Sequence, residues 1–263
     1  MELLTPVRPV DELSDQAAAM LPVIATMRAE SHHPFTLDEL ADMAFMSRFH
    51  FNRVFASVAG IPPGEFMTAL RFERAKDLLL TTDLSVTEVC FEVGYGSLGT
   101  FSARFAQLVG VSPAEFRRLP ELIDRGRPRI CSRLQEQPGT LSDAYVYGEL
   151  RGLGLAGGAV YLGLFPGRVA RGRPVTGTLL TNTTSFMLYN LPVGHYRLLA
   201  AALPAGQGLI DHLRPDEHLL VGTGEMPIEI ARGTERIRCD VHLRPPHITD
   251  APILVSLPAL VVT

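Results

Sequence analysis

The sequence of 263 residues has little cysteine, no long apolar run and no surplus of basic residues. Its three cysteines, Cys90, Cys131 and Cys239, lie far apart, which excludes a close-spaced zinc site and a disulfide framework. No window approaches the roughly twenty apolar residues of a membrane span, and the start MELLTPVRPVDEL lacks the features of a secretion signal. We therefore expect a cytoplasmic protein without a membrane segment.

The net charge of −4 is unevenly distributed along the chain. Residues 1–119 carry ten Lys or Arg and fifteen Asp or Glu, whereas residues 141–263 carry ten of each sign. If the first part binds a nucleic acid, its basic groups must form a local patch. Its sequence-independent affinity should then be modest, because that affinity scales with the phosphates neutralised. The alternative is that this acidic part does not touch DNA.

The chain divides into a helical part and a strand-rich part. Up to about residue 119 the apolar residues recur at spacings of three and four, which is typical of helices. Beyond residue 140, Gly and Pro are frequent and short runs such as AYVYGEL and SFMLYNL indicate an antiparallel β-domain. We predict an all-α domain over residues 1–119, a linker over 120–140 and an all-β sandwich over 141–263.

A segment of the helical part recurs after fifty residues. Ser47–Phe66 reads SRFHFNRVFASVAGIPPGEF and Ser97–Phe116 reads SLGTFSARFAQLVGVSPAEF, with eight of twenty aligned positions identical. A module used twice suits a ligand that itself repeats, and duplex DNA is such a ligand.

Each copy extends backwards into a further short helix. In the first copy Leu37 and Leu40 are expected to point inward, and Ala44 and its counterpart Gly94 are expected to close the helices. Ser47 and Ser97 are well suited to cap the helix that follows. Each copy therefore predicts a helix, a tight turn and a second helix.

The second helix of the first copy has a buried stripe and an exposed face. Phe51, Val54, Phe55 and Val58 fall at the spacing of one buried stripe. The opposite face carries Arg48, Phe49, Asn52 and Arg53. Arg and Asn are residue types that form paired hydrogen bonds with guanine and adenine edges in the major groove. A solvated helix face that happens to hold two arginines is the alternative.

The second copy offers a weaker reading face. Its outward positions are Leu98, Gly99, Thr100, Ser102 and Ala103. Arg104 aligns with Val54 at the edge of the buried stripe, so we expect it to reach a phosphate rather than a base. Thr100 and Ser102 offer hydrogen bonds, and Leu98 offers contact with a thymine methyl group.

An amphipathic segment, Gly64–Leu80, joins the two copies. As a rigid helix it would hold two reading helices in successive major-groove segments about 34 Å apart. Arg71, Arg74 and Lys76 on this spacer either contact phosphates or form a solvated face.

The runs RFERAKDLLL and VTEVCFEVGYGSLGTFSARFAQLVGVSPAEFR resemble the DNA-binding domain of the AraC/XylS family of bacterial transcription regulators. The resemblance covers about residues 20–118. It implies two helix-turn-helix units, with base-reading positions at Phe49, Asn52 and Arg53 in the first. In the second unit it implies Leu98, Gly99, Thr100 and Ala103. The family usually has arginine where Ala103 stands, so the second unit departs from the pattern.

The strand-rich part resembles a transthyretin-like or carboxypeptidase-regulatory-like β-sandwich over residues 144–203. The resemblance rests on the run SFMLYNLPVGHYRLLA, in which Tyr196 and Leu198 should point to one face. The histidines of this part lack metal-ligand spacing and a carboxylate partner, so we predict no catalytic or metal site and no cofactor. These histidines are His195, His212, His218, His242 and His247.

The leading hypothesis is a transcription regulator that binds double-stranded DNA, with a β-domain for a small-molecule effector or for self-association as a homodimer. RNA polymerase is a further expected partner. One alternative is that the β-domain serves purely for dimerisation or partner docking. Another is a small-molecule-binding or enzymatic β-domain whose helical part no longer binds DNA.

Overall fold

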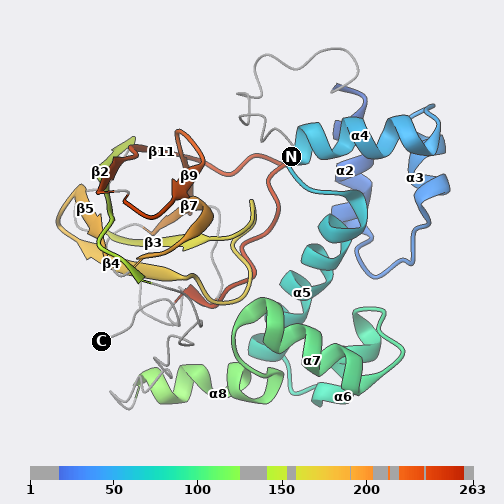
Figure 1. The fold of residues 1–263 in the computed structure, drawn as a ribbon. Coiled ribbons are helices and arrows are strands. Elements are labelled where there is room, and N and C mark those ends of the chain that lie inside the picture. The colour runs from blue at the N-terminus through green and yellow to red at the C-terminus, as the bar shows by residue number, and fades with distance from the viewer. Residues whose placement is uncertain are drawn as a thin grey trace. The chain divides into compact units, whose positions relative to one another are not determined.

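The computed structural model describes residues 18–124, 141–152, 158–189, 191–203, 213, 219–233 and 235–257 (Figure 1). The chain divides into two compact units. The helical unit comprises residues 1–105, 112–117 and 247–254, and the β unit comprises residues 106–111, 118–246 and 255–263. Most of the expected linker lies outside the described residues, but residues 120–124 continue the last helix.

Helices dominate the first part of the chain, as predicted. They are α2 (Met20–Ala29), α3 (Leu37–Met43), α4 (Arg48–Ala59), α5 (Pro63–Thr81), α6 (Val86–Glu92), α7 (Leu98–Val109) and α8 (Pro113–Asp124). None of the helices among the described residues is long and apolar enough to cross a membrane.

Polar caps fix where several of these helices begin. Thr36 and Glu39 form a reciprocal capping box at the start of α3, and Ser85 and Glu88 form one at the start of α6. Each box satisfies backbone N–H groups that a helix start would otherwise leave unpaired. The helix α4 ends at Gly60, whose φ of 77° is one that residues with a side chain rarely adopt.

Phenylalanines form the core of the helical unit. Phe51 and Phe55 of α4 pack with Phe66 of α5, and all three are fully buried. A second group contains Phe72, Phe101, Phe105 and Phe116, which are also fully buried. The two groups correspond to the two copies of the repeat, joined through α5.

The basic residues of the spacer helix α5 have internal roles. Arg71 donates to the carbonyl oxygens of Ser31 and His33, and Arg74 pairs with Glu92 at 3.3 Å. Lys76 is only 5% exposed and donates to the carbonyl oxygen of Ile253 at 3.1 Å. We expected these side chains either to contact phosphates or to form a solvated face. Both expectations were wrong for Arg71 and Lys76, because the two side chains donate to main-chain carbonyls.

The C-terminal segment His247–Leu254 belongs to the helical unit, although it follows the β-strands in the chain. Arg28 of α2 donates to the carbonyl oxygens of Ile248 and Asp250 at 2.9 and 2.6 Å. Together with the bond from Lys76 to Ile253, these contacts attach the segment to α2 and α5. Charge-assisted hydrogen bonds of this kind are among the stronger ones in proteins.

The second part of the described chain is built of strands, as predicted. They are β1 (Leu141–Ser142), β2 (Tyr145–Gly152), β3 (Ala159–Phe165), β4 (Thr176–Thr181), β5 (Ser185–Leu188), β6 (Leu191–Pro192), β7 (Gly194–Leu203), β8 (Leu220–Gly224), β9 (Ile228–Ile230), β10 (Arg236–Arg238) and β11 (Val241–Arg244). Nine of them form one sheet in the order β10-β2-β11-β8-β7-β3-β4, with β5 beside β2 and β9 beside β7.

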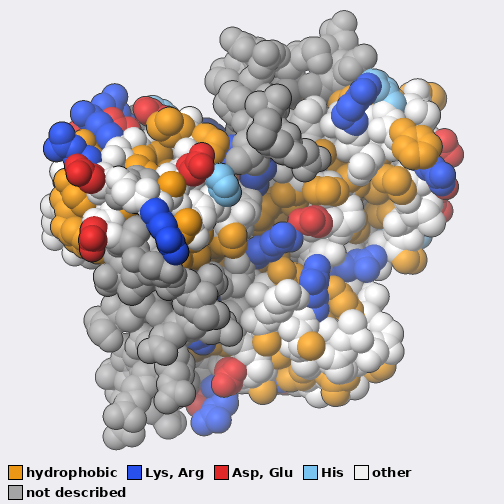
Figure 2. Space-filling view, viewed as in Figure 1, with side chains coloured by type: hydrophobic (Ala, Val, Ile, Leu, Met, Phe, Trp, Pro, Cys, Tyr) orange, Lys and Arg blue, Asp and Glu red, His pale blue; other side chains and the backbone are white. Residues whose placement is uncertain are grey.

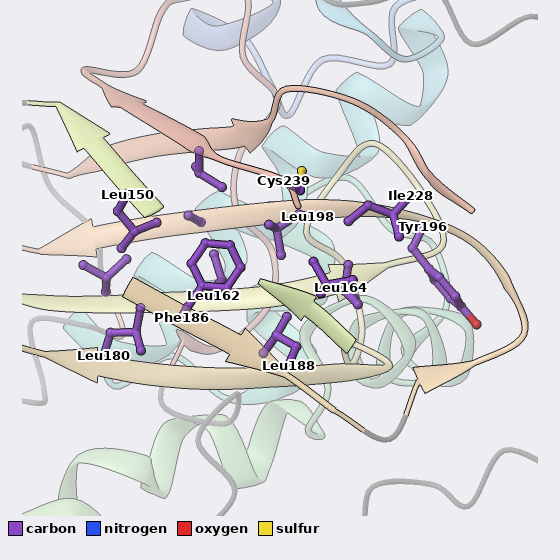
Figure 3. Packing of buried hydrophobic residues seen from close by; sticks show 14 of the residues in the cluster. Leu150, Leu162, Leu164, Leu180, Phe186, Leu188, Tyr196, Leu198, Ile228 and Cys239 are labelled. Carbon is purple, nitrogen blue, oxygen red and sulfur yellow. The ribbon is translucent and has the colours of Figure 1, made fainter. Parts of the chain in front are cut away.

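The nine-stranded sheet forms a near-barrel. Its buried apolar side chains pack into one cluster among the described residues (Figure 3). Tyr196 and Leu198 of β7 both belong to this cluster, which confirms that they share a face. The purely antiparallel prediction was wrong in one respect, because β2 pairs in parallel with β10 and β11. Those pairings join segments about ninety residues apart, and short strand patterns do not encode such long-range partners.

Candidate nucleic-acid interface

The first helix-turn-helix unit consists of α3 and α4 joined by a short turn. The turn is closed by bonds from the N–H groups of Ala44 and Met46 to the carbonyl oxygen of Ala41. Ser47 then caps α4 by accepting from the N–H of His50 at 3.5 Å. Leu37, which was expected to point inward, is 39% exposed because it lies in the first turn of α3.

The helix α4 separates a buried face from an exposed one. Phe51, Val54 and Phe55 are buried, as the periodicity predicted. The four candidate base-reading residues, Arg48, Phe49, Asn52 and Arg53, are all exposed. The buried residues on the opposite side of α4 pack into the core and hold the helix in place. The four exposed side chains are therefore carried by a packed helix and not by a loop.

Two contacts orient the exposed side chains of α4. The guanidinium of Arg48 lies 5.0 Å from the ring centroid of Phe49, within the range of a cation–π interaction. The Nη2 atom of Arg53 lies 3.2 Å from Nδ1 of His50, which accepts this bond when its ring is neutral with the proton on Nε2. Both arginines are thus partly preorganised on the exposed face.

Phe45 is a further exposed residue of this unit, and the repeat pattern gives no sign of it. It is 97% exposed and has a φ of 53°, a left-handed conformation that costs a residue with a side chain about 1–2 kcal/mol. Phe49, on the next helix, is 77% exposed. Phe45 therefore adds an aromatic ring to the exposed surface of the first unit, at a position where glycine would fit the backbone better.

The second unit repeats the first with one extra residue in its turn. Its caps show this directly, because Thr36 corresponds to Ser85 at an offset of 49 whereas Ser47 corresponds to Ser97 at an offset of fifty. The counterpart of Gly94 is therefore Phe45, and the expected pairing of Gly94 with Ala44 was wrong by one position.

The exposed face of α7 is less polar than that of α4. Leu98, Gly99, Thr100 and Ala103 are all exposed, and Ser102 is half-buried. The Oγ atom of Ser97 accepts from the N–H of Thr100 at 3.4 Å, so Ser97 acts as the cap that its position predicted. A methyl group at Ala103 stands where the first unit presents the guanidinium of Arg53.

Arg104 follows the buried Phe101 by three residues and precedes the buried Leu108 by four, so it lies beside the buried stripe of α7, and its side chain is exposed. Its positive charge, together with that of Arg71, opposes the effect of burial, which raises the pKa of Tyr95. Arg104 therefore lies close to the turn of the second unit.

Basic side chains on the face of the molecule in view are interspersed with apolar ones and form no continuous band (Figure 2). This agrees with the net negative charge of residues 1–119. On this face, any affinity for phosphates would rest on a few separate cations.

The described histidines of the strand-rich part do not form a cluster. His195 and His242 are exposed on different strands, and His247 contacts Thr249 at 2.9 Å. His212 and His218 lie outside the described residues. Within the described ranges no group of three or more His, Cys, Asp or Glu side chains is placed to hold a metal ion.

Comparison with known families gives a match over residues 40–119 to a family described as a helix-turn-helix domain. The chain is 37% identical over 82 residues to an uncharacterised helix-turn-helix transcriptional regulator of Haemophilus influenzae. That match covers 31% of this chain and 28% of the relative. This chain is also 34% identical to the activator RclR of Escherichia coli, over 36% of this chain and 34% of RclR.

A relative of smaller size is matched over more of its length. The activator AarP of Providencia stuartii is 26% identical over 39% of this chain and 76% of its own length. Among solved structures, the DNA-binding domain of AdpA in complex with a target DNA is 34% identical. The alignment covers 44% of this chain and 99% of the AdpA domain, with a TM-score of 0.38. The chain thus spans about a third of the length of two of these curated relatives.

Proposed function

We propose that this chain, in which residues 40–119 are a helix-turn-helix domain of the AraC type, is a sequence-specific DNA-binding transcription regulator. The observation that carries the proposal is the division of α4 into a fully buried phenylalanine face and an exposed face with Arg48, Asn52 and Arg53. Such a helix can enter the major groove while its other side stays anchored in the domain.

Each of the four candidate base-reading side chains of α4 has a chemical role in this proposal. Arg53 makes paired hydrogen bonds to guanine, and Asn52 makes them to adenine. Phe49 contacts a thymine methyl group, and the stacking of Arg48 on its ring keeps that guanidinium close to the groove. Sequence preference should therefore be concentrated in the half-site that α4 occupies.

The second unit is proposed to position the protein more than to read bases. Ser97, Thr100 and Ser102 offer hydroxyl groups, and Arg104 offers a cation to the phosphate backbone. Leu98, Gly99 and Ala103 leave room for close approach but present no donor that distinguishes bases. The two units then contact successive groove segments with unequal contributions to specificity.

The β unit is proposed to bind a small-molecule effector or to associate with a second copy of the chain. Either event would change how the helical unit engages DNA and RNA polymerase. A regulator acting on the bacterial chromosome would work in the cytoplasm.

The test is selection of duplexes from a random-sequence pool with the full chain, followed by gel-shift titrations at several salt concentrations. We expect an enriched site that binds about 10³-fold or more tightly than a scrambled duplex. Failure to enrich any sequence, or binding that disappears equally for all duplexes as salt rises, would overturn the proposal.

Variants separate the roles of the two helices. Arg53→Ala should reduce discrimination at one base pair by about 10- to 100-fold, whereas Arg104→Ala should weaken all duplexes alike and reduce the salt slope by about one. Arg232→Ala changes an exposed arginine of the β unit and serves as the matched control. Equal loss of discrimination in the Arg53 and Arg104 variants would contradict the assigned roles.

A further inference from the structure

Arg197 is a buried arginine in the middle of strand β7. It is only 5% exposed and lies directly opposite Phe165 of the neighbouring strand β3. Its neighbours Tyr196 and Leu198 belong to the apolar cluster, where both are labelled in Figure 3. Because side chains alternate along a strand, Arg197 points away from that cluster to the other face of the sheet.

Two nitrogen atoms of Arg197 have no hydrogen-bond partner among the described residues. Both Nε and Nη2 are buried, and neither is paired within the part of the chain that the structure describes. Buried polar groups in proteins are almost always hydrogen-bonded, so an unpaired pair of donors on one charged side chain requires an explanation. A buried charge without compensation is more costly than a neutral donor.

The surroundings of Arg197 contain a second positive charge. Burial lowers the pKa of Arg197, and the nearby charge of Arg168 lowers it further, while Cys239 opposes these effects. No carboxylate of the described residues contributes to that balance. Asp240, another buried charged residue of this unit, is by contrast paired with Arg151 at 2.8 Å and with Arg238 at 3.1 Å.

The two unpaired atoms have the geometry of a binding edge. In a guanidinium group, Nε–H and one N–H of Nη2 lie on the same edge of the plane and point in the same direction. This edge matches the two oxygen atoms of a carboxylate or a phosphate, which accept two parallel hydrogen bonds. The backbone of β7 fixes where this side chain begins, and the buried Phe165 of β3 lies directly opposite it.

We propose that Arg197 binds the carboxylate or phosphate group of a small organic ligand through Nε and Nη2, and that Arg168 adds a second positive charge to the site. The binding site is inferred from the β unit alone. Its use as the effector site of a regulator rests on the proposed function above.

The experiment follows thermal unfolding of the full chain in acetate, benzoate and inorganic phosphate, with chloride at the same ionic strength as the reference. A ligand that binds only the folded state raises the Tm in a saturable, concentration-dependent way. We expect such a rise with the carboxylates or with phosphate but not with chloride, and the response identifies which group the site prefers.

Variants assign the response to the binding edge. Arg197→Met removes the charge and the donors, and Arg197→Lys keeps the charge but loses the paired donors. Both should lose the Tm rise, and the lysine variant keeps the test usable if the methionine variant does not fold. Arg232→Met, at an exposed position of the same unit, should keep the wild-type response.

Two outcomes would overturn the proposal. One is a wild-type Tm that none of the three anions raises beyond chloride, and the other is a rise that persists undiminished in Arg197→Lys. These measurements need no DNA, so loss of the anion response and loss of DNA binding are independent results. If both activities are present, gel shifts with the preferred anion should show a changed affinity for the selected duplex.

Discussion

Replacing Lys76 by methionine should change how the stability of the protein depends on pH. The side chain is buried on α5, its ammonium group donates to Ile253 at 3.1 Å, and it lies 5.9 Å from the ring centroid of Phe116. Burial lowers the pKa of Lys76 from 10.5 to about 8, and the carboxylates of Glu73 and Asp77 offset only part of this effect.

The sign of the pH dependence follows from the two pKa values of Lys76. Below the folded-state pKa of about 8 the lysine is charged in both states, and the folded state carries the full cost of burying the charge. A difference of about 2.5 pKa units corresponds to about 3 kcal/mol. Between about pH 8 and 10.5 the unfolded state binds more protons, so the free energy of unfolding rises until this cost is gone.

The Lys76→Met variant should therefore lose about 3 kcal/mol of the rise in unfolding free energy between pH 7 and the upper end of this range. Near pH 7 its stability should be close to that of the wild type. The relief of the buried charge is offset by the carbonyl of Ile253, whose lost partner costs about 1–3 kcal/mol. Urea unfolding followed by far-UV circular dichroism measures both quantities, since the sequence has no tryptophan.

Other groups also titrate in this range, but they are common to both proteins. Burial raises the pKa of the Cys90 thiol, for example, and this contribution cancels in the difference between wild type and variant. Arg74→Met, at an exposed position of the same helix, should keep the wild-type pH dependence. If the free energies of unfolding of the wild type and Lys76→Met change in parallel with pH, the buried charge of Lys76 does not have the assigned effect.

Two further substitutions test the unequal helix-turn-helix units. Ala103→Arg should add base preference to the second half of the selected site and raise affinity for the matching duplexes by about 10-fold, as repeated selection would show; an unchanged site would contradict the alignment of Ala103 with Arg53. Phe45→Gly should be about 1 kcal/mol more stable to thermal unfolding than Phe45→Ala, because glycine tolerates the positive φ whereas alanine does not. Equal stability of these two variants would show that the turn relaxes at no cost.

Local features of the helical unit were predictable from its residues. The resemblance to AraC-type domains is confirmed over residues 40–119, and the buried positions of α4 follow from the spacing of Phe51, Val54 and Phe55. The caps at Ser47 and Ser97 also lie where expected. Such features depend on neighbours within one or two helical turns, so the sequence contains most of the relevant information.

Long-range contacts were not predictable in the same way. The bonds of Arg28 to Ile248 and Asp250 join residues more than 200 positions apart, and the apolar pattern gives no sign of them. A lysine on an amphipathic helix ordinarily indicates a solvated face, and the apolar pattern gives no sign of the distant carbonyl at Ile253 to which the buried Lys76 donates. The buried Arg197 was missed for a related reason, because a single polar residue in a strand pattern indicates an outward position.

The offset between the two units shows why similar sequences need not give similar surfaces. Four of the eight identical positions are buried in both copies, where packing constrains them, namely Phe51/Phe101, Phe55/Phe105, Pro63/Pro113 and Phe66/Phe116. The exposed positions are free of that constraint, and there Arg53 is replaced by Ala103. The extra residue before Ser97 lengthens the second turn. Ahead of it, Gly94 takes without strain the left-handed conformation that its counterpart Phe45 takes in the first unit. Shared buried positions and a differing exposed surface are what the proposed division between reading and positioning requires, because only exposed side chains could contact DNA.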